Sequence, residues 1–236
     1  MLLTGKNAVI YGGGGNIGGA VAREFAREGA KVHLAGRTLE TLKAVGDEIG
    51  AECAVVDALD ADAVEAHAAA IGRIDVSFNL IDVRDVQGTP MAEMDVEDFL
   101  SPVVTAVRSH FLTWKAAARH GAGVILVFGG EGDPIRGYSI GGFQVALHAL
   151  EAMRRQFSTE NRDVRVVTLR TGGIPETIPS SFAPREEITN SLNDATLSGR
   201  AATLDDVARV AAFVASDHAR TMTAATVNVS AGALLD

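Results

Sequence analysis

The sequence predicts an α/β fold of three layers, in which a doubly wound parallel sheet of about seven strands carries helices on both faces. Two observations lead to this prediction. Apolar runs with the length of buried strands alternate along the chain with stretches of helical periodicity. The 236 residues, 47% of them hydrophobic, are enough for one large core, and no change of composition suggests a linker. We therefore expect a single domain over residues 1–236.

The apolar runs place the expected strands, and the periodic stretches between them place the helices. In chain order, strands are expected near residues 7–11, 31–35, 52–56, 74–80, 123–128, 164–170 and 225–229. Helices are expected near residues 17–28, 38–49, 60–71, 95–119, 143–160 and 204–216. Each crossover should be right-handed. The segment near residues 172–203 is polar and contains three prolines, so we expect an irregular loop that covers a ligand.

The first expected strand runs directly into a glycine-rich turn. Residues 8–11 read Ala-Val-Ile-Tyr, and Gly13, Gly15 and Gly18 fit the spacing G-x-G-x-x-G. Apolar residues then recur with helical spacing over residues 21–26. Glycines let backbone N–H groups approach a pyrophosphate closely, and the start of a helix carries a partial positive charge. The pattern predicts a dinucleotide site, and a merely flexible glycine turn is the alternative.

Charge and cysteine content exclude several classes of protein. The net charge of −9 and the isoelectric point near 5.1 give no basic surface for nucleic acid or for an anionic membrane. The single cysteine, Cys53, rules out an intrachain disulfide framework and is typical of a reducing cytoplasm. No apolar run approaches about 18 residues, so we expect neither a signal peptide nor a spanning helix. The expectation is a cytoplasmic protein with a small-molecule substrate.

Several motifs resemble those of the short-chain dehydrogenase/reductase family, and the resemblance spans essentially the whole chain. Residues 11–18 match the family pattern T-G-x3-G-x-G, with Tyr11 in place of Thr and Asn16 in place of the middle Gly. Asn tolerates a left-handed backbone, so we expect the phosphate turn to persist. Residues 171–174 resemble the P-G-x-I stretch beside the nicotinamide carboxamide, and residues 227–232 match the closing run. The resemblance implies a Rossmann fold and a nicotinamide cofactor.

The glycine turn and the family resemblance together give a set of expected cofactor-binding residues. By resemblance, Asp57 stands where the family contacts adenine, and Asn79 lies in the stretch that resembles the lead-in to the N-N-A-G motif. The full set is Gly12, Gly14, Gly15, Asn16, Ile17, Gly18, Arg37, Asp57, Ala58, Asn79, Thr171, Gly172 and Ile174.

The end of the second expected strand indicates which nicotinamide cofactor is bound. A carboxylate at this place would bind the ribose 2′-hydroxyl and repel a 2′-phosphate. Residues 35–38 read Ala-Gly-Arg-Thr and contain no acid. Arg37 offers a planar, permanently charged group suited to phosphate, which favours NADP over NAD. The alternative is that Arg37 is an ordinary solvated residue at the start of a helix.

The catalytic positions of the family are occupied by residues without its chemistry. The resemblance implies an Asn, a Ser, a Tyr that gives its proton to a carbonyl oxygen, and a Lys that lowers the pKa of that Tyr. Ala106, Gly130, Phe143 and Leu147 stand at these four positions. None of the four side chains can donate a proton. A positioned acid contributes roughly 10²–10⁴ in rate, so any catalysis needs a substitute.

Two residues are candidate substitutes for the missing acid. Tyr138 lies five residues before the expected tyrosine, and its phenol could reach a substrate at the cleft rim or simply cap the core. His110 lies one helical turn beyond Ala106 on the same face, where an imidazole can act as an acid near neutral pH. The alternative for His110 is hydrogen-bonded packing. Cysteine, histidine and carboxylate spacing gives no metal site.

Two functions remain open at this point. The first is an NADP-dependent oxidoreductase that acts on a small carbonyl or alcohol with a non-standard active site. The second is a catalytically inactive dinucleotide-binding protein, a sensor or partner subunit, and a non-redox enzyme on the same fold is a further alternative. The helices near 95–119 and 143–160 are apolar on more than one face. Because family members pair through these helices, we expect a homodimer or homotetramer.

Overall fold

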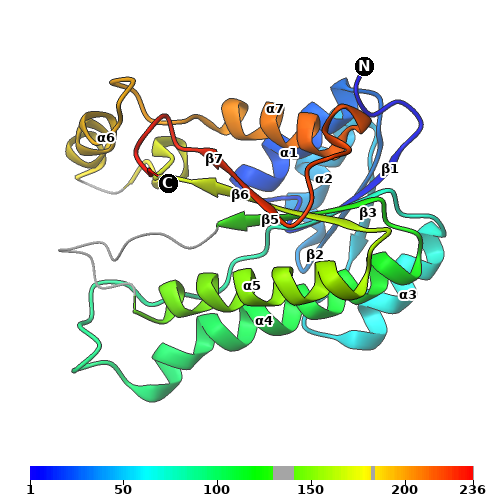
Figure 1. The fold of residues 1–236 in the computed structure, drawn as a ribbon. Helices are drawn as coiled ribbons and strands as arrows, with labels where there is room; N and C mark the ends of the chain where they lie inside the picture. The colour runs from blue at the N-terminus through cyan, green and yellow to red at the C-terminus, as the bar shows by residue number, and fades with distance from the viewer. Residues whose placement is uncertain (130–140, 182–183, 236) are drawn as a thin grey trace.

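A parallel sheet of seven strands forms the centre of the computed structural model, which describes residues 1–129, 141–181 and 184–235 (Figure 1). The strand order is β3-β2-β1-β4-β5-β6-β7, and every neighbouring pair is parallel. The chain winds outward from β1 in one direction, returns to β4 and then winds in the other direction. This order confirms the predicted doubly wound α/β fold.

The strands and helices lie close to their expected positions. The strands are β1 (Asn7–Tyr11), β2 (Lys31–Gly36), β3 (Glu52–Val55), β4 (Val76–Asn79), β5 (Val124–Gly129), β6 (Arg165–Thr171) and β7 (Ala225–Val229). The α-helices are α1 (Asn16–Arg27), α2 (Leu39–Ile49), α3 (Ala61–Ile71), α4 (Val96–Arg119), α5 (Gly141–Glu160), α6 (Arg185–Asp194) and α7 (Leu204–Ala215). Two short 3₁₀ turns span Pro175–Thr177 and Asp217–Ala219.

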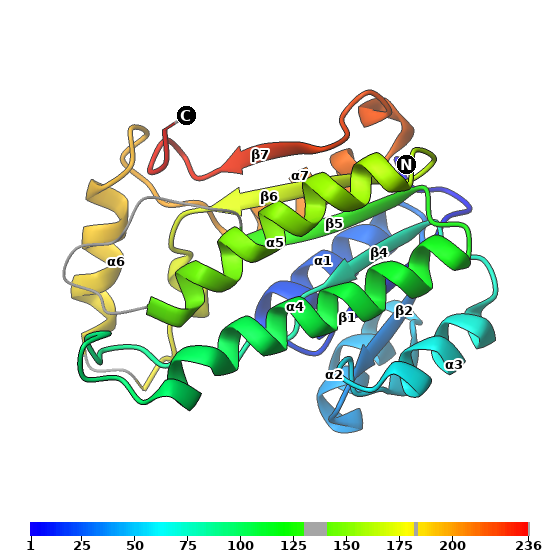
Figure 2. The ribbon, with the colours of Figure 1, turned by 60° about the horizontal axis from the view of Figure 1, so that its bottom comes forward.

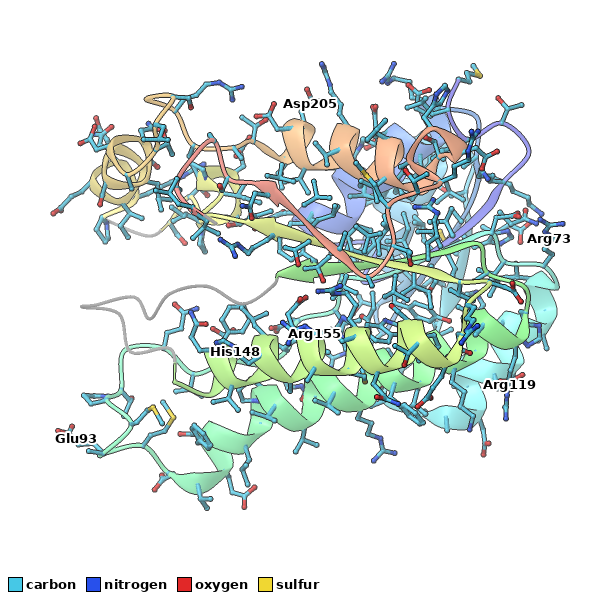
Figure 3. The ribbon with its side chains drawn as sticks, viewed as in Figure 1. Arg73, Glu93, Arg119, His148, Arg155 and Asp205 are labelled. Atoms are coloured by element: carbon cyan, nitrogen blue, oxygen red, sulfur yellow. The ribbon has the colours of Figure 1, made fainter. Side chains whose placement is uncertain are left out.

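Helices cover both faces of the sheet, as Figure 2 shows from below the view of Figure 1. Helices α1, α2 and α7 bury their apolar residues against one face, together with side chains such as Ile10 and Phe78. Helices α3, α4 and α5 bury theirs against the other face, around Trp114 and Tyr11. Side chains fill the space between the sheet and both helical layers (Figure 3). Burial of this apolar surface is the main force that holds the layers together.

Local hydrogen bonds set the ends of several helices. Thr203 and Asp206 form a capping box at the start of α7, in which each side chain accepts from the backbone N–H of the other. Asp60 accepts from two backbone N–H groups at the start of α3. At the other end of α7, the Arg165 guanidinium donates to the carbonyls of Val214 and Ser216 at 2.9 and 3.2 Å. These contacts fix α7 against β6.

The segment near residues 172–203 is more regular than its sequence predicts. It contains a 3₁₀ turn at Pro175–Thr177 and the ten-residue helix α6. Glu186 and Glu187 lie in the first turn of α6, directly after Pro184, where a helix accepts both negative charge and proline. The expectation of an irregular loop is therefore wrong for this part. Helix α6 lies beyond the carboxyl ends of β5 and β6 (Figure 1).

Helices α4 and α5 run side by side along one face of the sheet (Figures 1 and 2). They approach closely at Gly142, where an added Cβ would lie 2.2 Å from the carbonyl oxygen of Phe99. Glycine is therefore required at this crossing. Despite the 24-residue length of α4, none of the helices in the described residues is long and apolar enough to span a bilayer.

Candidate functional site

A cleft of about 820 Å³ opens at the carboxyl ends of the central strands. Its lining comes from the glycine turn, from residues 36–38 at the end of β2, from residues 56–59 after β3 and from residues 79–85 at the end of β4. Helices α4 and α5 close its other end. Ligands of doubly wound sheets bind at the carboxyl edge where the strand order reverses, and here that point lies between β1 and β4.

Close backbone contacts explain the glycines of the turn. Gly12 has φ +79°, and a Cβ there would lie 2.4 Å from the carbonyl oxygen of Leu80. A Cβ on Gly18 would lie 2.2 Å from the carbonyl oxygen of Gly12. Asn16 is the first residue of α1 and has no positive φ, so the turn accommodates it without the left-handed backbone that we expected it to tolerate. Side chains at positions 12 and 18 would close the turn.

The N-terminus of α1 is open toward the cleft. Gly15 caps the helix without a side-chain hydrogen bond, and the first turn contains no acidic residue. Gly15, Asn16, Ile17 and Gly18 all line the cleft. Backbone N–H groups in the first turn of a helix have no partner within the helix, and they carry its positive dipole end. The arrangement fits a diphosphate group.

Arg37 directly follows β2 and lines the same cleft. It is exposed, and it forms no ion pair or hydrogen bond with the residues that the structure describes. Asp57, which also lines the cleft, accepts a hydrogen bond at Oδ1 from the backbone N–H of Leu59 at 2.9 Å, which fixes its orientation. The guanidinium of Arg37 is therefore available to an anionic ligand.

Asn79 ends β4 at the middle of the cleft and is only 2% exposed. Its Oδ1 atom accepts a hydrogen bond from the backbone N–H of Ile81 at 3.2 Å. Its Nδ2 atom is buried and has no partner among the described residues. A buried donor without a partner costs about 1–3 kcal/mol, and an acceptor on a ligand would remove that cost. The side chain is thus consistent with its expected cofactor-binding place.

Three expected cofactor residues lie outside the cleft lining. Thr171 ends β6 and Gly172 follows it, while Ile174 is 5% exposed in the main core. From this segment, the lining instead contains Thr177. The other ten expected residues all line the cleft. Sequence reasoning did not find Thr177, because the 3₁₀ turn that carries it has no periodic pattern.

The far end of the cleft is apolar where the family pattern has polar groups. Ala106 on α4 and Phe143 and Leu147 on α5 line it. A Cβ on Gly129, whose φ is +117°, would lie 2.6 Å from Cδ2 of Leu147, so Leu147 packs tightly against the end of β5. Gly130 and Tyr138 lie outside the described residues. The structure brings three of the four altered positions together in one wall.

His110 lies behind that wall and also contributes to the lining. Its Nδ1 atom lies 2.9 Å from the carbonyl oxygen of Ala106, an acceptor, so the ring proton is on Nδ1. Burial lowers the pKa of His110 to about 4. At pH 7 the ring is neutral and its N–H is already used. This geometry does not support the acid role near neutral pH that we expected.

The loop after β4 adds charged residues that the expected site did not include. Asp82, Arg84 and Asp85 line the cleft. Oδ1 of Asp82 accepts from the backbone N–H of Arg84, which has φ +60°. Their position after a strand at the ligand-binding edge is the sequence signal that identifies them. Within the described residues, no group of three or more His, Cys, Asp or Glu is arranged to hold a metal ion.

Comparisons with known proteins agree on one family. A family model described as enoyl-(acyl carrier protein) reductase matches residues 14–233. Momilactone A synthase from Oryza sativa subsp. japonica is 29% identical, with 98% of this chain and 90% of that protein covered. Galactitol 2-dehydrogenase (L-tagatose-forming) from Cereibacter sphaeroides is 27% identical, with 98% and 95% covered.

Solved structures show the same fold. A short-chain type dehydrogenase/reductase from Mycobacterium ulcerans superimposes with a TM-score of 0.88 at 22% identity, covering 99% of this chain and 91% of that one. An NAD⁺-bound xylitol dehydrogenase superimposes with a TM-score of 0.84 at 20% identity, covering 98% of this chain and 100% of that one. At these identities the likeness concerns the fold alone.

Proposed function

The chain belongs to the short-chain dehydrogenase/reductase family, and on that premise we propose that it is an NADP(H)-dependent oxidoreductase with a non-standard active site. The family uses nicotinamide cofactors, and proteins similar to this chain include a galactitol 2-dehydrogenase and an NAD⁺-bound xylitol dehydrogenase. The proposed substrate is a small carbonyl or alcohol. The observation that carries the proposal is one continuous cleft, which joins an open glycine turn and a free arginine to an apolar pocket.

Different residues along this cleft would bind different parts of the cofactor. The N–H groups at the start of α1 would hold the diphosphate, with Gly12 and Gly18 allowing its close approach. Asp57 would bind at the adenine end, and Nδ2 of Asn79 would donate to the cofactor near the middle of the cleft. When bound, the nicotinamide supplies or accepts a hydride. The apolar side chains at the far end would exclude water from that exchange.

Arg37 supports the choice of NADP over NAD. No carboxylate stands beside it after β2 to receive the ribose 2′-hydroxyl, since residues 35–38 read Ala-Gly-Arg-Thr. Its guanidinium has no partner among the described residues and lines the cleft. A phosphate is the ligand for which an unpaired, planar arginine at this position is best suited. Fluorescence titration with NADPH and NADH tests this choice directly.

Proton transfer at the far end needs a donor from elsewhere in the chain. Ala106, Phe143 and Leu147 carry no transferable proton, and the only N–H of neutral His110 is bound to a carbonyl. We propose Tyr138 as the donor. A Tyr138→Phe variant should bind NADPH as the parent does and lose most of its turnover, by the roughly 10²–10⁴ that a positioned acid contributes.

A second function is favoured by the same apolar wall. Three adjacent positions without polar chemistry suit a protein that binds the dinucleotide and does not turn it over, such as a sensor or a partner subunit. One experiment distinguishes the oxidoreductase from the binding protein. An oxidoreductase consumes NADPH with some member of a panel of ketones, aldehydes and quinones, whereas a binding protein shows NADPH fluorescence changes and no consumption.

We also propose that the protein assembles as a homodimer or homotetramer through α4 and α5. Val104 and Phe111 on α4 are 56% and 49% exposed, and Val145 on α5 is 41% exposed. His148, labelled in Figure 3, is also exposed on α5. Large apolar side chains exposed together on neighbouring helices are typical of a protein interface.

A further inference from the structure

The loop between β3 and α3, at the end of the cleft proposed for adenine, is contacted by an arginine of α4. Asp57 and Leu59 of this loop line the cleft. Arg108 lies in α4, 49 residues further along the chain than Leu59, and is exposed. Its Nε–H group donates a hydrogen bond to the carbonyl oxygen of Leu59 at 2.9 Å. Arg108 is not among the described residues that line the cleft, so its contact is with the loop and not with a ligand.

The backbone of Leu59 links Arg108 to the side chain of Asp57. The N–H group of Leu59 donates to Oδ1 of Asp57 at 2.9 Å, and the carbonyl of Leu59 accepts from Arg108. A hydrogen bond from a charged donor is stronger than one from a neutral donor. The bond from Arg108 therefore fixes Leu59, and Leu59 in turn supplies the donor that orients the Asp57 carboxylate.

The path of the loop is fixed by hydrogen bonds that do not involve Arg108. The backbone N–H of Val56 donates to the carbonyl of Gly36 at 3.0 Å, which ties the start of the loop to β2. The backbone N–H of Asp60 donates to the carbonyl of Asp57 at 3.0 Å, and the Asp60 side chain caps α3. Loss of the Arg108 bond would therefore change the orientation of the Asp57 side chain more than the course of the chain.

One oxygen of the Asp57 carboxylate is left for a ligand. Oδ1 is used by Leu59, and Oδ2 accepts no hydrogen bond within the part of the chain that the structure describes. A carboxylate only accepts hydrogen bonds, and the amino group of adenine is a donor. Hypoxanthine has an oxygen in place of that amino group, and this oxygen would face the carboxylate as a second acceptor. A carboxylate held in a fixed direction therefore distinguishes the two bases.

We propose that Arg108 is a positioning residue for the cofactor, because its bond to the carbonyl of Leu59 holds the Asp57 carboxylate where it accepts from the amino group of adenine. This inference rests on the proposed function and adds to it a device that selects the base. Arg108 acts through Leu59 and touches neither the cofactor nor the substrate. Orientation of a binding group by residues behind it is a common source of specificity.

Fluorescence titration of the intact protein with two nucleotides tests the proposal. The probes are NADPH and deamino-NADPH, in which hypoxanthine replaces adenine. The variants are Arg108→Leu and Arg119→Leu. Arg119, labelled in Figure 3, is the matched control, because it is also an exposed arginine of α4 and its Nη1 atom pairs with Oε2 of Glu65 on α3 at 3.6 Å. Circular dichroism checks the fold of both variants, and Arg108→Gln takes the place of Arg108→Leu if the latter does not fold.

We expect the parent to bind NADPH more tightly than deamino-NADPH, and Arg108→Leu to lower this ratio of affinities roughly threefold to tenfold. Arg119→Leu removes the same charge and should leave the ratio unchanged. In an Asp57→Ala background, Arg108→Leu should not lower the ratio further, because it acts through the carboxylate that this background lacks.

Three results would overturn the role of Arg108 and leave the proposed function standing. They are an unchanged ratio in Arg108→Leu, an equal fall in Arg119→Leu, and an undiminished effect of Arg108→Leu in the Asp57→Ala background. A parent that binds neither nucleotide would overturn the proposed function, and this inference with it.

Discussion

Nδ1 of His110 lies 2.9 Å from the carbonyl oxygen of Ala106, one turn earlier on α4. The Nδ1–H group of the ring donates a hydrogen bond to this carbonyl, and burial keeps the ring neutral by lowering its pKa to about 4. The same two residues stand where the family pattern would place an asparagine and its neighbour one turn on. The side chain of Ala106 has no polar group, so this position offers the ring only its backbone carbonyl.

The first prediction concerns stability at acidic pH. Because the pKa of His110 falls from an ordinary 6.5 to about 4 on folding, the unfolded chain binds the proton first as pH decreases. Its contribution to stability is fully present above pH 6.5 and is lost progressively between pH 6.5 and 4, by about 3 kcal/mol. Urea unfolding of the parent and His110→Leu across this range measures the difference in slope.

His33 and His67 also have pKa values lowered by burial, so the parent curve includes them. The variant retains both, and the difference between the two curves isolates His110. Parallel curves for parent and variant would show that His110 has an ordinary pKa.

The second prediction compares two glycines of the turn. In Gly18→Ala the new Cβ meets the carbonyl oxygen of Gly12 at 2.2 Å, so the turn must open. In Gly15→Ala the nearest atom, the same carbonyl oxygen, is 3.4 Å away. We expect Gly18→Ala to lose NADPH binding by tenfold or more, on the order of 1.4 kcal/mol, and Gly15→Ala to bind nearly as the parent does. Equal affinities of the two variants would contradict the assignment of the turn.

The third prediction tests Arg37 against another arginine of the cleft. Loss of a charge-assisted hydrogen bond to phosphate costs about 1.5–3 kcal/mol, so Arg37→Leu should weaken NADPH roughly tenfold to a hundredfold and leave NADH unchanged. Arg84 also lines the cleft, but it follows β4 instead of β2. Arg84→Leu should leave the ratio of the two affinities as it is. If the ratio of NADPH affinity to NADH affinity changes equally in both variants, Arg37 is not the residue that selects NADPH.

The fourth prediction concerns assembly. Phe111→Glu places a charge on the exposed apolar face of α4, and light scattering after gel filtration should show a smaller particle than the parent. Phe213 on α7 is 40% exposed on the opposite face of the sheet, and Phe213→Glu is the matched control. Dissociation by the control alone would place the interface on α7.

Much of the fold could be predicted because the sheet is buried on both faces. Strands such as β1 and β5 consist almost entirely of apolar residues. In the helices between the strands, apolar residues recur at helical spacing. Helix α6 could not be predicted in this way, since most of its residues are polar and none is buried. Its N-terminus has no side-chain cap either, so neither an apolar period nor a capping residue marks it in the sequence.

The candidate site also has a part that the sequence predicts and a part that it does not. The glycine turn and Arg37 could be located because backbone geometry and charge follow directly from residue type at a fixed distance from β1 and β2. Thr177 could not, because only the fold brings its 3₁₀ turn to the cleft, and the protonated nitrogen of His110 could not be assigned either. For His110, the hydrogen bond from Nδ1 to the carbonyl of Ala106 in the same helix sets the tautomer, and a residue type does not show which nitrogen carries the proton.

The most direct test of the central claim is a calorimetric titration of the parent protein with NADPH and with NADH at one ionic strength. The account predicts that NADPH binds at least tenfold more tightly, because Arg37 receives the 2′-phosphate and no carboxylate receives the 2′-hydroxyl. Equal affinities, tighter binding of NADH, or no binding of either cofactor would contradict it.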